Sequence, residues 1–361
     1  MKKIITVVGA RPQFVKASVL SSLINSDECL NETLVHSGQH FDFSMSDQFF
    51  RDLAIPEPKY KCHLELGSEA SQIGQIMISL DDIFRQEKPH LVIVYGDTNT
   101  TLAASLMAAK LGFPLAHVEA GLRSFRPAMA EEINRKVSDH LSQYCFCPTL
   151  NSVKNLNSEG ISKNLFMVGD IMLDVFIKTR QKLNTLKMIG ELGLCDDEYY
   201  FVTLHRAENV TDHATLSRII EALRELSFGS KKIIFAAHPR TKKMISALAL
   251  DLGRIHVVGP LPYPNTVACL VHASVVITDS GGLQKEAYFA ETPCVTVRDE
   301  TEWLETLENG HNRLLPPNDC NRLIETIAEI QNSRLPEFLP IYGDGNAGEK
   351  ICQHLKDILS V

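Results

Sequence analysis

The segment Leu91-Val92-Ile93-Val94-Tyr95-Gly96-Asp97 is an unbroken apolar run that stops on a carboxylate. A second run, PLAHVE at 114–119, follows farther along the chain and also ends on a carboxylate. Unbroken apolar strands are typical of a parallel sheet that is buried on both faces. Open α/β sheets bind ligands beyond the carboxyl ends of such strands. The two segments therefore predict parallel strands that carry chemical groups at their ends.

The second half of the chain repeats this arrangement. The run YFVTLHR at 200–206 ends on an imidazole and a guanidinium, and SVVITDSGG at 274–282 ends on a turn of small residues that opens a helix. Because 361 residues are comfortable for two domains, we expect two parallel sheets. Strand ends that face each other would then form a cleft between the domains.

Apolar strands alternate with helical patterns along the whole chain, which indicates βαβ units. The fold class expected is α/β, with two doubly wound, Rossmann-type domains. We place the N-terminal domain at 1–170 and the C-terminal domain at 171–346. A final amphipathic helix, within 347–361, is expected to pack back on the N-terminal domain.

Composition excludes several classes of protein. The net charge of -8 leaves no basic field with which to bind nucleic acid. No apolar run approaches the roughly 18 to 20 residues that a membrane span requires. The nine cysteines lack CxxC spacing and are typical of free thiols in a reducing cytosol. We therefore expect a cytoplasmic protein with no nucleic-acid or membrane partner and no metal site.

The motif GARPQFVK at 9–16 follows the first strand and opens a helix. It is neither GxGxxG nor a P-loop, so no dinucleotide fingerprint is present. Arg11 in the turn and Lys16 in the first helical turns could instead hold an anion together with backbone amides. The alternative is a pair of solvated cations near a helix start.

The motif SGGLQKE at 280–286 is the counterpart in the second half. Glycines after a buried strand let a phosphate approach the backbone at a helix N-terminus. Glu286 lies farther into the helix, where a carboxylate can accept hydrogen bonds from two ribose hydroxyls. The alternative is a tight turn followed by an acid that the helix dipole favours.

Acidic residues at strand ends are the candidates for proton transfer. Asp97 and Glu119 end two strands, and Glu131 begins a helix beside a second glutamate. Partly buried carboxylates can reach pKa values useful for acid/base chemistry. One member of the pair at 131–132 could instead serve only as a helix N-terminal charge. His205, at a strand end of the second half, could supply a base or a phosphate contact.

Taken together, these segments resemble a known family. The ordered set GARPQFVK, YGDTNTTLA, HVEAGLRS, EEINR, HRAEN, HPRT and TDSGGLQKEA is similar to the motifs of non-hydrolysing UDP-N-acetylglucosamine 2-epimerases, and it spans nearly the whole chain. The resemblance implies a GT-B-like architecture with the active site between two domains. It also implies inversion at C2 of a UDP-linked amino sugar, by elimination of UDP to a 2-acetamidoglucal and its re-addition.

The resemblance also implies roles for the residues that match the motifs. Asp97, Glu119 and Glu131 would form the acid/base set, and His205 would assist the departing phosphate. The substrate-binding set would be Arg11, Lys16, Leu261, Ser280, Gly281, Gly282 and Glu286, and secondary candidates would be Arg123, Arg135, Arg206 and Tyr263. No cofactor or metal is implied. The family further implies a homodimer that supplies precursors for bacterial surface polysaccharide.

The substrate stays open between two sugars. The patterns QHFD at 39–42 and RDETEW at 298–303 resemble a branch that includes epimerases of UDP-2,3-diacetamido-2,3-dideoxyglucuronate. In that late segment, Trp303 stands where many members of the family carry a cation. Two other classes of function share such a nucleotide site, namely a UDP-sugar glycosyltransferase and a non-catalytic UDP-sugar sensor.

Overall fold

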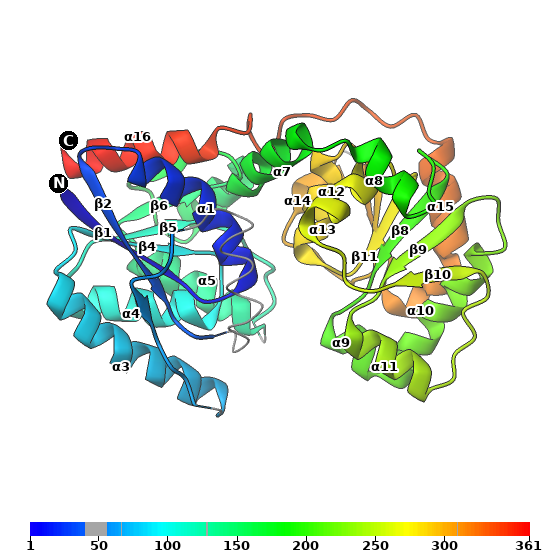
Figure 1. The fold of residues 1–361 in the computed structure, drawn as a ribbon, viewed down its shortest axis with the longest axis horizontal. Coiled ribbons are helices and arrows are strands. Elements are labelled where there is room, and N and C mark those ends of the chain that lie inside the picture. Colours follow the sequence, from blue (N-terminus) through cyan, green and yellow to red (C-terminus); the bar gives the residue numbers. More distant parts are fainter. Residues whose placement is uncertain (40–55, 66, 128, 309) are drawn as a thin grey trace. The chain divides into compact units, whose positions relative to one another are not determined.

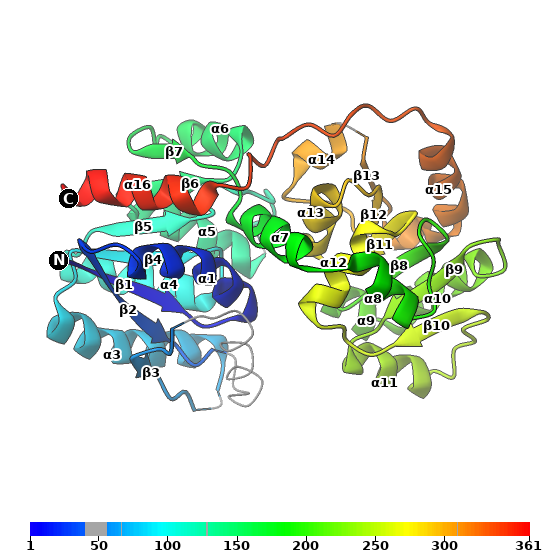
Figure 2. The ribbon, with the colours of Figure 1, turned by 45° about the horizontal axis from the view of Figure 1, so that its top comes forward.

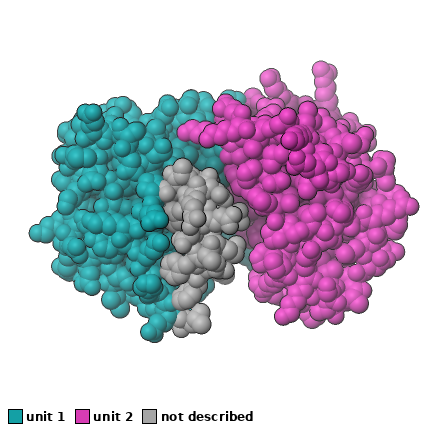
Figure 3. Space-filling view, in the orientation of Figure 1, with its two compact units in different colours: residues 1–175, 340–361 teal, residues 176–339 magenta. Residues whose placement is uncertain are grey.

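The structure, a computed structural model, describes residues 1–39, 56–65, 67–127, 129–308 and 310–361. It divides into two compact units, which are coloured separately in Figure 3. Unit 1 holds Met1–Val175 and Pro340–Val361, and unit 2 holds Phe176–Leu339. The sequence analysis placed these two boundaries at 170/171 and 346/347.

Unit 1 is built on a parallel sheet, which has seven strands within the described residues, in the order β3-β2-β1-β4-β5-β6-β7 (Figure 1). Its core consists of apolar runs that are buried on both faces of the sheet, as in β4, where every residue is fully buried. The strands are β1 (Lys2–Val8), β2 (Leu30–His36), β3 (Tyr60–Lys61), β4 (Leu91–Tyr95), β5 (Leu115–Val118), β6 (Tyr144–Cys147) and β7 (Leu165–Met167).

Helices cover both faces of this sheet. The helices of this part of the chain are α1 (Arg11–Asn25), α3 (Glu69–Glu87), α4 (Asn99–Leu111), α5 (Ala130–Leu141), α6 (Leu150–Ser158), α7 (Ile171–Lys182) and α16 (Ala347–Leu359). Figures 1 and 2 show α3 and α4 on one face and α1 with α16 on the other. The C-terminal helix α16 thus lies in unit 1, where the His354 ring is 4.3 Å from the Phe166 ring between centroids.

Unit 2 repeats the plan with a six-stranded parallel sheet, in the order β10-β9-β8-β11-β12-β13. Its strands are β8 (Tyr199–Thr203), β9 (Lys232–Ala236), β10 (Ile255–Val258), β11 (Val275–Thr278), β12 (Cys294–Thr296) and β13 (Asn312–Leu314). Its remaining helices are α8 (Thr185–Glu191), α9 (Ala207–Thr211), α10 (His213–Leu226), α11 (Pro239–Ala247), α12 (Tyr263–Val271), α13 (Gly281–Phe289), α14 (Leu304–Glu308), the 3-10 helix η1 (Pro317–Arg322) and α15 (Leu323–Asn332). The prediction of two parallel α/β sheets is confirmed.

The order of strands explains why chemistry collects at particular strand ends. In unit 1 the chain begins with a central strand, β1, moves out to β2 and β3, and then returns to β4 on the other side of β1. The order in which the chain adds strands therefore reverses between β1 and β4, and in unit 2 it reverses between β8 and β11. Ligand sites of open α/β sheets lie at such switch points. Among the described residues, no helix is long and apolar enough to cross a membrane.

Candidate active site

The turn between β1 and α1 is fastened to the end of β4 by Gln13. The Gln13 amide oxygen accepts hydrogen bonds from the N–H groups of Gly9 and Ala10, at 2.8 and 3.0 Å. Its nitrogen donates to the Tyr95 carbonyl at 2.8 Å. The β1–α1 turn and the β4 end are thereby held at one edge of the sheet. The backbone of α1 begins at Arg11, whose side chain lies outside the described part of the structure.

Lys16 and Glu119 form an ion pair at this edge. Lys16 comes from the second turn of α1, and Glu119 follows the last residue of β5. Their side chains are only 10% and 9% exposed. Two charges taken out of water are costly unless they are paired, so each group offsets the cost of burying the other. Glu119 adopts a φ of 74°, a left-handed conformation that is uncommon for a residue with a side chain.

Asp97 and Arg135 form a second pair nearby in unit 1. The Arg135 guanidinium donates to the Asp97 carboxylate at 2.6 Å, and the Asn134 amide donates to the Asp97 carbonyl at 2.9 Å. The Asp97 side chain is 32% exposed, whereas that of Arg135 is 4% exposed. Two residues of helix α5 therefore hold the turn that carries Asp97. The Asp97 carboxylate keeps access to solvent.

Gly96 lies between the Lys16–Glu119 pair and the Asp97–Arg135 pair. Its φ of 63° is in the left-handed region, and a Cβ there would lie 3.3 Å from a Glu119 carboxylate oxygen and 3.5 Å from the Lys16 ammonium. The residue directly before Asp97 thus lies against the Lys16–Glu119 pair. The structure therefore places Asp97, Glu119, Lys16 and Arg135 around one turn of unit 1.

The two glutamates at the start of α5 have different environments. Glu131 is exposed, whereas the Glu132 side chain is 1% exposed. The Glu132 carboxylate accepts from the Ser124 N–H at 2.9 Å and pairs with Arg135 at 3.1 Å. Burial alone would raise the pKa of Glu132, but Ser124 and Arg135 outweigh it and lower the pKa. Glu131 is the member of the pair that a ligand can reach.

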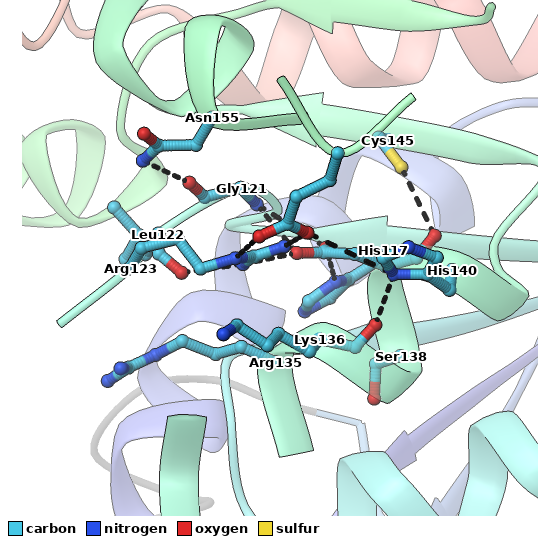
Figure 4. A network of polar contacts seen from close by, with 12 residues as sticks. His117, Gly121, Leu122, Arg123, Arg135, Lys136, Ser138, His140, Cys145 and Asn155 are labelled. Carbon is cyan, nitrogen blue, oxygen red and sulfur yellow. Dashed lines mark hydrogen bonds and ion pairs between the residues drawn. The ribbon is translucent and has the colours of Figure 1, made fainter. Parts of the chain in front are cut away.

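Arg123 is engaged within unit 1 rather than exposed to a ligand. Its fully buried guanidinium donates to Asp139 at 2.7 Å and makes two bonds to Glu159, at 2.8 and 2.7 Å. Figure 4 shows this network around Arg123, Gly121 and His117. The secondary candidate Arg123 therefore stabilises the segment after β5, and its hydrogen bonds leave it no direct approach to a ligand.

In unit 2, Asp279 organises the turn after β8. The fully buried Asp279 carboxylate accepts from the N–H groups of His205 and Arg206, at 3.1 and 3.0 Å, and from the Asn209 amide at 3.2 Å. Burial by itself would raise the pKa of Asp279, but its bonds and charge interaction with His205 and the backbone bond from Arg206 outweigh this and lower it. The His205 ring lies 3.2 Å from this carboxylate and is 49% exposed. The imidazole is thus oriented by Asp279 and still accessible.

The start of α13 presents backbone donors beside a buried ion pair. The Ser280 hydroxyl caps the helix by accepting from the Leu283 N–H at 3.3 Å, and Gly281 and Gly282 form the first helical positions. The Glu302 carboxylate, which pairs with Arg298 at 3.0 Å, occupies the space that a Cβ on Gly281 would need. Exposed N–H groups at a helix N-terminus can bind phosphate oxygens.

The other candidates of unit 2 lie around α12 and α13. Glu286 is 8% exposed on α13, and Arg206 pairs with Glu208 at 3.0 Å. Leu261 precedes α12 and Tyr263 begins it, and both are partly buried. Among the described residues, no cluster of three or more His, Cys, Asp or Glu side chains has an arrangement that could hold a metal ion.

Comparison with known proteins gives the family. A family model described as UDP-N-acetylglucosamine 2-epimerase matches residues 23–356. The chain belongs to this family, whose members are isomerases. It is 41% identical to the UDP-2,3-diacetamido-2,3-dideoxy-D-glucuronate 2-epimerase of Pseudomonas aeruginosa, over 98% of this chain and 99% of that protein. The resemblance seen in the sequence is confirmed.

Solved structures of epimerases have the same fold. The UDP-GlcNAc 2-epimerase of Methanocaldococcus jannaschii, in complex with UDP-GlcNAc and UDP, matches with a TM-score of 0.89 at 36% identity, covering 99% of this chain and 100% of that chain. The enzyme of Neisseria meningitidis, bound to UDP-GlcNAc, matches with a TM-score of 0.87 at 28% identity, covering 98% and 100%. The expected GT-B-like, two-domain α/β fold is thereby confirmed for this epimerase-family chain.

Two features of this epimerase-family chain bear on the substrate branch. The single tryptophan, Trp303, is 3% exposed and receives the Lys285 ammonium 4.2 Å from its ring centroid. Trp303 stands where many members of the family carry a cation. In this chain Lys285, from α13, places a cation beside the Trp303 indole. In the QHFD pattern, residues 40–42 lie outside the described residues.

Several residues that organise the site were not singled out from the sequence. His117, Asp139 and Asp279 each make buried hydrogen bonds that hold a strand-end turn. Gln13 does the same for the turn between β1 and α1. It occupies the third position of α1, where Glu or Gln often accepts a hydrogen bond from the N-cap backbone, so the sequence could have indicated this role. His117 and Asp279 stand inside motifs and Asp139 does not, and the partners of all three are distant in sequence.

Proposed function

We propose that this protein inverts C2 of a UDP-linked 2-acetamido sugar, with interconversion of UDP-N-acetylglucosamine and UDP-N-acetylmannosamine as the primary reaction. The observation that carries the proposal is the placement of two strand-end carboxylates, Asp97 and Glu119, around the Gly96 turn, each with its own cation. Membership of the epimerase family supports the same chemistry.

The reaction requires a proton to leave C2 while the bond from C1 to the UDP oxygen breaks. The products are UDP and a 2-acetamidoglucal. A proton then adds to the opposite face of C2, and UDP adds back at C1. We propose that Asp97, Glu119 and Glu131 give and accept these protons. Arg135 lies beside Asp97 and Lys16 beside Glu119, so each of these two acids would exchange the proton next to a cation.

The nucleotide is proposed to bind residues of unit 2. The backbone N–H groups of Gly281 and Gly282 at the start of α13 would receive phosphate oxygens, and Glu286 would bind the ribose. His205 would contact the leaving phosphate, because Asp279 orients its ring and half of its side chain is exposed. Leu261 and Tyr263 would contact the uracil, and Arg11, Lys16 and Arg206 would add cations near the diphosphate. These hydrogen-bond donors and cations would thus stabilise the negative charge that develops on UDP as it leaves.

A second candidate substrate is UDP-2,3-diacetamido-2,3-dideoxyglucuronate. The 41% identity with the Pseudomonas aeruginosa epimerase of that name favours it. The reaction at C2 would be the same, and only the recognition of the 3-acetamido and carboxylate groups would differ.

Product analysis separates these possibilities. Purified protein is incubated with each UDP-sugar in turn, and the nucleotide sugars are resolved by anion-exchange chromatography and identified by NMR. The primary proposal predicts a UDP-linked manno epimer from UDP-N-acetylglucosamine. Turnover of the uronate alone would transfer the assignment to the second substrate. Free N-acetylmannosamine would indicate hydrolysis, sugar transfer to an added acceptor would indicate a glycosyltransferase, and binding without turnover would indicate a sensor.

We extend the proposal to a cytoplasmic homodimer that supplies an amino-sugar precursor for surface polysaccharide. The family resemblance supports the homodimer and the precursor role, and the cysteines without CxxC spacing support the cytoplasmic location. Sedimentation equilibrium tests the oligomeric state, and a sedimenting mass near the 40.2 kDa of one chain would contradict it.

A further inference from the structure

His117 lies in the middle of the buried network of unit 1. It stands in β5, two residues before Glu119, and its side chain is fully buried. One ring nitrogen, Nδ1, is 2.7 Å from the Asp139 carboxylate, and the other, Nε2, is 2.7 Å from the Gly96 carbonyl oxygen. Figure 4 shows the His117 ring among the side chains of this network.

The partners decide how many protons the ring carries. A backbone carbonyl can only accept a hydrogen bond, so Nε2 has to donate to Gly96. The Asp139 carboxylate also accepts from the Gly121 N–H at 3.2 Å and from Arg123 at 2.7 Å. Burial by itself would raise the pKa of Asp139, but its interactions with His117 and Arg123 lower it. Asp139 is therefore an acceptor only, and Nδ1 also has to donate.

The charges around the ring balance when both nitrogens are protonated. With a second proton on its ring, His117 would share positive charge with Arg123, opposite the negative charges of Asp139 and Glu159. Further titratable neighbours are the Cys145 and Cys147 thiols, whose pKa values are raised by burial, and the exposed His140, whose ring is 4.0 Å from Glu159. A buried cation with two acceptors and a charged partner is stable where an unpaired one would not be.

The ring is also connected to the groups proposed to do the chemistry. Its Nε2 holds the carbonyl of Gly96, and Gly96 directly precedes Asp97. The Cα of Gly96 faces the Lys16–Glu119 pair. A shift of this one carbonyl would therefore change the position of Asp97 and its distance from Glu119.

We propose that His117, protonated on both nitrogens, is a positioning residue that aligns Asp97 and Glu119 through the Gly96 carbonyl without touching the substrate. This inference rests on the proposed C2 epimerisation. A misplacement of about 1 Å in a reacting group costs about 100-fold in rate. The expected effect is thus on the chemical step and not on nucleotide binding.

The first test is the protonation state in the wild-type protein. Histidine is labelled with ¹⁵N, and the side-chain nitrogens are recorded by long-range ¹H–¹⁵N NMR at neutral pH. The His117 signals are assigned by comparison with the His117→Gln variant. We expect both nitrogens to show the shifts of a doubly protonated ring. One nitrogen with the shift of an unprotonated imidazole would overturn the inference.

The second test is kinetic and compares two Gln variants. His117→Gln should lower kcat by about 10- to 100-fold while KM for the UDP-sugar and the Kd of UDP change by less than about threefold. His256→Gln is the matched control, because His256 also lies in a strand, β10, but is exposed. The control should keep the wild-type kcat. A His117→Gln variant with wild-type kcat would contradict the positioning role.

Failure of this inference differs from failure of the proposed function. If wild-type protein turns over no UDP-acetamido sugar, the proposed function fails, and the NMR measurement still decides the protonation of His117. If His117→Gln does not fold, Asp139→Asn replaces it, since that change removes the charge that holds the second proton. Asp139→Asn should also lower kcat with little change in KM, and an unchanged kcat would count against the proposal.

Discussion

At the scale of single residues, the Lys16–Glu119 pair determines much of what unit 1 can do. Both side chains are about nine-tenths buried, so neither charge is well solvated without the other. The carboxylate nevertheless lies beside the turn at Gly96, the residue that directly precedes Asp97. Glu119 is therefore held in a fixed position by Lys16 and lies at a strand end, where it could transfer a proton.

Glu119→Gln is the residue-scale prediction. The amide keeps the shape of the side chain but cannot take up a proton, so we expect kcat to fall by about 100-fold or more. The Kd of UDP, measured by calorimetry, should change by less than about threefold. Because Lys16 loses its partner charge, the free energy of unfolding in urea should also fall, by about 1–3 kcal/mol.

The matched control is Glu349→Gln, an exposed carboxylate on α16 in the same unit. It should keep the wild-type kcat and the wild-type unfolding free energy. Unchanged turnover in Glu119→Gln would remove Glu119 from the acid/base set.

At the scale of elements, α5 separates two adjacent glutamates into different roles. Successive helical residues point about 100° apart, so the helix that buries Glu132 leaves Glu131 exposed. The sequence EE does not reveal which of the two faces inward. That choice depends on which side of α5 packs against Ser124 and Arg135.

The pair Glu131→Gln and Glu132→Gln tests this division. Glu131→Gln should lower kcat and leave the unfolding free energy within about 0.5 kcal/mol of wild type. Glu132→Gln should lower the unfolding free energy by about 1–3 kcal/mol, because the buried donors around it lose a charged acceptor. Urea unfolding and initial rates measure the two effects. A stable Glu132→Gln protein and an unstable Glu131→Gln protein would reverse the assignment.

The first turn of α13 gives a second element-scale prediction. A methyl group at Gly281 would meet the Glu302 carboxylate, which is held by Arg298, whereas a methyl group at Gly282 would have only the Ser280 hydroxyl nearby, at 3.9 Å. Gly281→Ala should therefore cost about 1–3 kcal/mol in unfolding free energy through overpacking. It should also weaken UDP binding, which calorimetry would measure.

Gly282→Ala serves as the control for the helix itself. Alanine favours a helix over glycine by about 1 kcal/mol, so this change should be neutral or stabilising for folding. Equal stability of the two variants would contradict the packing described around Gly281.

At the scale of the whole molecule, both sheets were predictable from the sequence because their central strands are long apolar runs between helical patterns. β3 and β13 were not predicted. β3 has two residues, β13 begins on Asn312 and Arg313, and both are edge strands without an apolar pattern. The helix α6 was also missed, and so were α9 and α14, whose five residues each are too few to show a helical period.

The places of Asp97, Glu119 and His205 just after β4, β5 and β8 were predictable from the apolar runs, because parallel strands bring their carboxyl ends to one edge of a sheet. Their functional roles stay predictions. His117, Asp139 and Asp279 were missed because their roles depend on partners that tertiary structure supplies. Arg123 was placed among the ligand contacts because the sequence alone does not show that Asp139 and Glu159 hold it.

The buried aspartates predict how stability depends on pH. The pKa values of Asp139 and Asp279 are lowered in the folded protein. A lowered pKa contributes stability that is fully present above the unfolded value, about 3.9, and is lost as pH falls through the folded value. The unfolding free energy should therefore decline steadily as the pH is lowered below about 4. Urea unfolding across this range measures it, and Asp279→Asn should flatten the decline; an equally steep decline in this variant would contradict the assignment.

The central claim is that carboxylates of unit 1 move the C2 proton of a sugar that stays linked to UDP when the reaction is complete. The most direct test is NMR of the reaction with UDP-N-acetylglucosamine in deuterated water. We predict deuterium at C2 of both the recovered substrate and the manno epimer, each still attached to UDP. Epimer that retains protium at C2, or sugar that leaves UDP permanently, would contradict the claim.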